Sequence, residues 1–92
     1  MVDAVVLIKV EPGSVTKIAN ALLDLKGITE VFSVAGNYDV VALVHVLENE
    51  DLAELVGERI RNVQGIHSTQ TLIAFRKYSR RERETGFNLG ID

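Results

Sequence analysis

The chain contains the same arrangement twice: an aliphatic stretch, an amphipathic stretch with helical spacing, and then a glycine followed by isoleucine. The first copy runs from Val5-Val6 to Gly27-Ile28 and the second from Val40-Val41 to Gly65-Ile66. A duplicated strand–helix–strand unit in a chain of 92 residues is typical of the split βαβ arrangement. We therefore predict an α+β fold, a ferredoxin-like βαββαβ sandwich with a four-stranded antiparallel sheet and two helices on one face.

The strands are expected where β-branched residues are dense and glycine, proline or acidic residues stand at the borders. This places them at residues 4–10, 28–35, 39–47 and 66–75. Residues 1–75 are predicted to form one domain, because a chain of this length supports a single core. Residues 76–92 form a basic C-terminal extension, which would pair with acidic neighbours in an oligomer or, less simply, contact nucleic acid.

Two helices are predicted from apolar residues at helical spacing. The first follows Ser14, a good N-cap, and ends at Gly27. The second begins at Asp51, which has a glutamate three residues on as in a capping box, or at Asn49, and it ends at Gly65. The apolar positions are Val15, Ile18, Leu22 and Leu25 in the first helix, and Leu52, Leu55, Val56, Ile60 and Val63 in the second.

The stretch Ala35-Gly36-Asn37-Tyr38-Asp39 connects the two middle strands. Gly-Asn between strands predicts a tight two-residue hairpin turn, since both residues tolerate a positive φ. Tyr38 and Asp39 place a phenol hydroxyl and a carboxylate beside the backbone N–H groups that a glycine exposes. This set would suit a small molecule with an amine and a carboxylate, although ordinary turn chemistry also explains the glycine and the asparagine.

One face of the predicted sheet has no helix to cover it. An antiparallel sheet with a solvated face should alternate apolar and polar residues, and the two central strands do not. We assign the rows with the lysine and the histidine to the uncovered face. These rows comprise Val5, Leu7, Lys9, Val41, Leu43 and His45. Four large apolar side chains, at roughly 1.5–3 kcal/mol each if fully buried, would contribute about 6–12 kcal/mol, so we predict a dimer formed through the sheets.

Composition excludes several functions. The chain has no cysteine, which removes thiolate metal sites, redox dithiols and disulfides. Its formal net charge of −3 argues against nucleic acid as the main partner. His45 and His67 have no carboxylate at a metal or triad spacing, so we predict no catalytic residue, no metal site and no cofactor. No signal peptide or membrane span is apparent, and a cytoplasmic location is expected.

Two motifs together resemble a known family. Gly36-x-Tyr38-Asp39 leads into an aliphatic strand, and Gly65-Ile66-x-x-Thr69-x-Thr71 opens the last strand. Their order and spacing resemble the effector-binding domain of the Lrp/AsnC transcription regulators, also called the RAM domain. The resemblance covers about residues 4–75 and implies the fold predicted above.

The resemblance also implies partners and a site. In that family, dimers form through the sheets and assemble further, commonly into octamers, and small effectors, usually amino acids, bind between dimers. Asp39 would then bind an α-ammonium group, while backbone N–H groups near Gly36 would face a carboxylate. The candidate ligand-binding residues are Gly36, Asn37, Tyr38, Asp39, Thr69 and Thr71.

The chain departs from full-length family members, which carry an N-terminal helix-turn-helix domain. Here the first strand starts near Ala4, so direct DNA binding is not expected. The expected function is a non-enzymatic amino-acid-binding and oligomerisation module that binds its effector alone or co-assembles with full-length regulators. One alternative is a small dimeric α/β-barrel enzyme, such as a cofactorless monooxygenase or isomerase. It is disfavoured because the helix-facing rows lack polar groups. Another is a purely structural assembly module.

Overall fold

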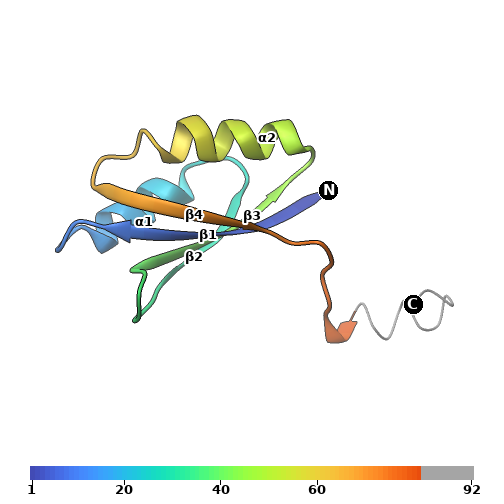
Figure 1. Ribbon diagram of the computed structural model, residues 1–92, viewed down its shortest axis with the longest axis horizontal. Helices are drawn as coiled ribbons and strands as arrows, with labels where there is room; N and C mark the ends of the chain where they lie inside the picture. Colours follow the sequence, from blue (N-terminus) through green and yellow to red (C-terminus); the bar gives the residue numbers. More distant parts are fainter. Residues whose placement is uncertain (82–92) are drawn as a thin grey trace, which may run out of the picture.

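A four-stranded antiparallel sheet carries the helices on one of its faces in the computed structural model, which describes residues 1–81 (Figure 1). The elements in chain order are β1 (Val2–Val10), α1 (Val15–Leu23), β2 (Ile28–Ser33), β3 (Val40–Val46), α2 (Asn49–Glu54), the π-helix η1 (Leu55–Ile60) and β4 (Ile66–Ile73). The strand order is β2-β3-β1-β4. The predicted βαββαβ sandwich is therefore confirmed. Of the predicted extension, residues 82–92 lie outside the described part.

The core lies between the helices and the two central strands. Alternate residues of β1 and β3 point to the helices, because successive strand side chains face opposite sides. Val6, Ile8, Val40 and Ala42 have no exposed surface at all. They pack with the buried helix residues Ile18, Leu22, Leu52, Leu55 and Ile60. These are the rows that the sequence assigned to the covered face.

The predicted two-residue turn between β2 and β3 is wrong. β2 ends at Ser33 and β3 begins at Val40, so the connection comprises residues 34–39. Gly36 has a φ of +137°, and no residue other than glycine among residues 1–81 has a positive φ. Asn37 therefore does not adopt the conformation that a type I′ turn requires. The Val34 N–H donates to the Asp39 carbonyl oxygen at 3.0 Å, and this hydrogen bond joins the two ends of the connection.

The starts of the helices differ in detail from the prediction. α2 begins at Asn49, the alternative start, with Glu48 at the N-cap position. The Glu48 N–H donates to the Asp51 carboxylate at 3.0 Å, so the capping box joins Glu48 to Asp51 and not Asp51 to Glu54. Ser14 occupies the N-cap position of α1 but makes no side-chain capping bond. Its carbonyl oxygen accepts from the Ile18 N–H at 2.9 Å.

The second helix does not keep α-helical winding. From Leu55 to Ile60 it is a π-helix, in which hydrogen bonds join residues five apart. Leu55 and Ile60 are consequently both buried, and the Arg59 guanidinium contacts the Glu54 carboxylate at 2.9 Å. The regular 3.6-residue stripe that the sequence predicted does not describe this segment.

Candidate functional site

The face of the sheet without helices has an apolar centre and polar ends. Strand register aligns six apolar residues in two neighbouring rows, which we call the bare face: Phe32, Val41 and Leu7, then Leu43, Val5 and Leu72. Phe32 and Leu72 are 46% and 47% exposed, and the other four are half-buried. Because these four are already partly covered by neighbours in the sheet, burying them contributes less than four complete burials would.

A hydrogen bond between two side chains lies at each end of the bare face. Asp3 and His45 are paired across β1 and β3, and the His45 Nδ1 lies 2.6 Å from the Asp3 Oδ1. At the other end the Tyr38 hydroxyl donates to the Gln70 Oε1 at 2.5 Å. The Lys9 ammonium lies 5.8 Å from the centre of the Tyr38 ring. The predicted interface residues Lys9 and His45 are thus exposed and stand at opposite ends of an apolar centre.

Asp39 joins the hairpin connection to the central strand β1. Its Oδ2 accepts a hydrogen bond from the Val10 N–H at 3.0 Å. Its own N–H donates to the Ile8 carbonyl oxygen, also at 3.0 Å. The register of β1 against β4 shifts between Lys9 and Val10, and the Asp39 carboxylate satisfies a backbone donor at that irregularity. Asp39 therefore has a structural role that the motif alone did not indicate.

Thr69 and Thr71 lie on the other face of the sheet from Tyr38. They pair with Ile8 and Val6, whose side chains point to the helices, and they alternate with Gln70, the partner of Tyr38. Thr69 is exposed and Thr71 is half-buried on β4, an edge strand. Gly36 and Asn37 are both exposed. Thr69 lies opposite Ile8 and Thr71 opposite Val6, in the middle of β1, so a single chain does not bring Tyr38 and the threonines together.

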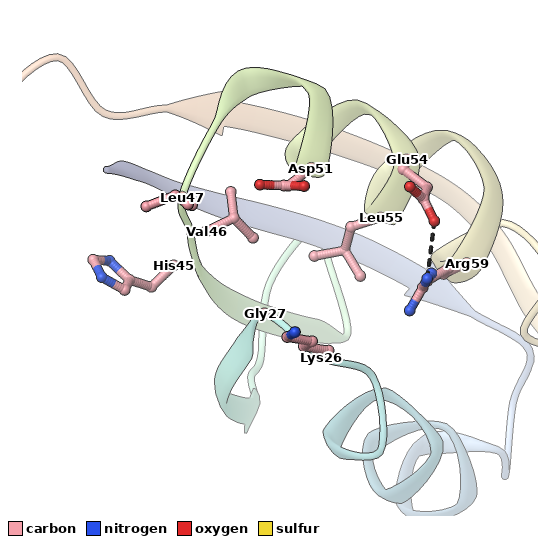
Figure 2. Close-up of a pocket in the computed structure, with 9 residues that line it drawn as sticks. All are labelled: Lys26, Gly27, His45, Val46, Leu47, Asp51, Glu54, Leu55 and Arg59. Carbon is pink, nitrogen blue, oxygen red and sulfur yellow. Dashed lines mark hydrogen bonds and ion pairs between the residues drawn. The ribbon is translucent and has the colours of Figure 1, made fainter.

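The structure also contains a hollow that sequence reasoning missed. It has a volume of about 440 Å³ and lies between the turn after α1, the end of β3 and the helix α2–η1 (Figure 2). Its lining residues, which define the hollow below, are Lys26, Gly27, His45, Val46, Leu47, Asp51, Glu54, Leu55 and Arg59. These residues belong to three separate elements and form no motif in the sequence. The one local signal was the five-residue spacing of Leu55 and Ile60.

Two further features bear on the kind of site. Residues 1–81 contain no group of three or more His, Asp or Glu side chains placed to hold a metal ion. Within the same residues, no helix has both the length and the apolar character needed to cross a membrane.

The fold and these surfaces define a small α+β domain with one sheet face covered by helices and the other available for contact. The chain belongs to the family described as the Lrp/AsnC ligand binding domain, which matches residues 3–84. An uncharacterised helix-turn-helix-type transcriptional regulator of Pyrococcus furiosus is 31% identical over 75 residues, which are 78% of this chain and 50% of that protein. The chain spans about half the length of the curated regulators it matches.

Solved structures show the same fold. The protein TTHA0845 of Thermus thermophilus has a TM-score of 0.81 and 40% identity, with 87% of this chain and 100% of that chain covered. A transcriptional regulator of Neisseria meningitidis, solved as a complex with L-Met, has a TM-score of 0.76. It shares 10% identity, with 86% of this chain and 53% of that chain covered. At this identity the likeness concerns the fold alone.

Matches to enzymes are partial. A homocitrate synthase of Sulfurisphaera tokodaii is 29% identical over 77 residues, covering 83% of this chain and only 16% of the enzyme. The stronger sequence matches are transcriptional regulators. The share of the relative that is matched is therefore larger for the regulators than for the enzyme.

Proposed function

We propose that this domain is a non-enzymatic module that binds an amino acid or a similar small effector and assembles by pairing its bare faces. The observation that carries the proposal is the bare face itself. Its aliphatic centre, framed by the Asp3–His45 and Tyr38–Gln70 hydrogen bonds, has the apolar core and polar rim of a protein interface. A second copy of the same face supplies a matching surface through a two-fold axis.

The effector would bind at the hairpin end of the sheet. The Asp39 Oδ2 is occupied by the Val10 N–H, while no hydrogen bond to Oδ1 occurs within residues 1–81. That oxygen is available for an ammonium group, and the exposed Gly36 leaves backbone N–H groups accessible to a carboxylate. Tyr38 and the threonine pair face opposite sides of one sheet, so a pocket that uses all of them takes residues from more than one chain.

Assembly beyond the dimer is supported by β4. This edge strand and the residues after it expose Ile73 and Phe75 outside the bare face, and exposed edges of this kind favour pairing with another chain. We propose that dimers associate further into a ring such as an octamer, with effector sites between dimers. An amino acid carries the ammonium and the carboxylate that Asp39 and the backbone N–H groups near Gly36 would bind.

The partners of the assembled module would be regulators of the same family. Its relatives are transcriptional regulators that this chain matches over about half of their length, so we propose that it co-assembles with such regulators and transmits effector binding to them. The net charge of −3 disfavours direct contact of these residues with DNA, because phosphate contacts depend on Lys and Arg.

The test is calorimetric titration of the twenty protein amino acids into the wild type and Asp39→Asn. Asparagine retains an oxygen that accepts from the Val10 N–H but carries no charge, so the effector's affinity should fall about tenfold or more. Asp24→Asn, which removes an exposed carboxylate at the end of α1, should leave binding unchanged. Equal affinity of wild type and Asp39→Asn would remove Asp39 from the site.

A further inference from the structure

The hollow lies at the other end of β3 from the hairpin connection. Its strand residues are His45 and Val46, whereas the hairpin ends at Asp39 and Val40. A ligand in the hollow would therefore not touch the effector site proposed above. Its volume of about 440 Å³ falls in the range of roughly 300–1,000 Å³ that is usual for small-molecule sites.

The floor of the hollow is apolar, and backbone contacts of Gly27 fix the position of the turn beside it. Gly27 has a φ of +102°, and a Cβ there would lie 2.8 Å from the Val46 Cγ1 and 3.4 Å from the Leu55 Cδ2. The Gly27 carbonyl oxygen accepts from the His45 N–H at 2.8 Å. The turn after α1 is thus packed directly on β3 and η1, a close approach that only a glycine allows.

The walls carry charges of both signs. Figure 2 shows Lys26 on the turn after α1, and Asp51, Glu54 and Arg59 on the helix, arranged around Leu55. Asp51 accepts one hydrogen bond from the Glu48 N–H, and Arg59 uses one nitrogen to contact Glu54. The ammonium of Lys26 has no hydrogen-bond or ion-pair partner within the described residues. A cation and an anion therefore remain available on facing walls.

The π-helical winding of η1 places Arg59 in the hollow. In an α-helix, residues five apart lie more than a third of a turn from each other, and Arg59 would then point away from Glu54. With the winding observed, the two side chains meet at 2.9 Å and both line the hollow. π-helical segments are rare and occur frequently at functional sites.

We propose that the hollow binds a second small molecule, a zwitterion with an aliphatic body. Its carboxylate would contact Lys26 and the free N–H groups of Arg59, since a guanidinium has five donors. Its ammonium would contact the Asp51 carboxylate, and its aliphatic part would lie on Leu55 and Val46. Opposite charges above an apolar floor recognise such a molecule better than they recognise a simple anion or a simple amine.

The experiment is methyl NMR on the full 92-residue protein with labelled Leu and Val methyl groups. L-leucine, L-valine and L-methionine are titrated, and the Leu55 and Val46 methyl signals report the hollow while Val34 and Val40 report the hairpin end. We expect saturable shifts at Leu55 and Val46. N-acetyl-L-leucine and L-leucinamide, each lacking one charge, should bind there about tenfold more weakly than L-leucine, the loss expected for one charged contact.

Two variants locate the charges. Lys26→Ala and Arg59→Gln change residues that line the hollow, and each should weaken the affinity measured at Leu55 about tenfold, whereas Asp39→Asn should not change it. Lys17→Ala, an exposed lysine of α1 outside the hollow, is the matched control. The proposal is wrong if Leu55 and Val46 do not shift with any of the three amino acids. It is also wrong if the blocked forms bind equally well, or if Lys26→Ala and Arg59→Gln both retain wild-type affinity.

Discussion

The two faces of the sheet are built from nearly the same residue types and yet have different surroundings. In β1, Val6 and Ile8 have no exposed surface, while their sequence neighbours Val5 and Leu7 remain half-buried. All four are aliphatic, so composition does not separate the faces. In the sequence, the two faces differ by one polar residue in each row of the bare face: Lys9 in β1 and His45 in β3. A single polar residue at the end of a row was enough to predict which face the helices leave open.

The proposed dimer should be strongly sensitive to a charge added at the centre of the bare face. Leu43→Glu places a carboxylate in its centre, and a two-fold interface would contain that carboxylate twice. An unpaired buried charge costs several kcal/mol, so the dimer dissociation constant should rise at least about a hundredfold. Sedimentation velocity across micromolar concentrations measures this change.

The matched control for that variant is Leu23→Glu. Leu23 is half exposed at the end of α1, outside the bare face, so the same substitution there should leave the dimer intact. A Leu43→Glu protein that stays dimeric would show that the sheets do not pair.

Side chains on the covered face should contribute more to the free energy of unfolding of a single chain than those on the bare face. In the Leu43→Glu background, in which the proposed dimer is expected to dissociate, Ile8→Ala should lower the free energy of unfolding by about 2–5 kcal/mol, because it leaves a cavity under the helices. Leu7→Ala, one residue away, should lower it by less than about 1.5 kcal/mol, since Leu7 is only partly buried. Urea denaturation measures both, and equal losses would contradict the difference between the faces.

The hydrogen bonds at the polar ends of the bare face should contribute least to the stability of the proposed dimer. Tyr38→Phe removes the hydroxyl that donates to Gln70, and a hydrogen bond of this kind contributes about 0.5–1.5 kcal/mol. The bond lies within one chain, so its loss should lower the free energy of unfolding by about that amount and weaken the proposed dimer by no more than about tenfold. Tyr78→Phe, on an exposed tyrosine beyond β4, is the control and should have no effect. A loss as large as that from Leu43→Glu would make the polar end, and not the apolar centre, the main contact.

The motif named candidate residues but did not predict their contacts within the chain. The motif grouped Tyr38, Asp39 and the threonines as one site, whereas the structure places Tyr38 and the threonines on opposite faces of the sheet within a single chain. The motif did not show that Asp39 accepts from the Val10 N–H or that Tyr38 reaches Gln70. Both contacts depend on the register of three strands, and register is decided by the whole set of cross-strand contacts.

The sequence by itself determined the order of the elements and, in the two central strands, the side of the sheet on which each residue lies. Both follow from local periodicity, because a strand alternates every residue and a helix repeats every 3.6. Only the tertiary structure decided the connection at residues 34–39, the π-helical winding of η1 and the hollow beside it. These depend on how separate segments pack together. The close contact of Gly27 with Val46 and Leu55 joins three elements, and no stretch of sequence contains it.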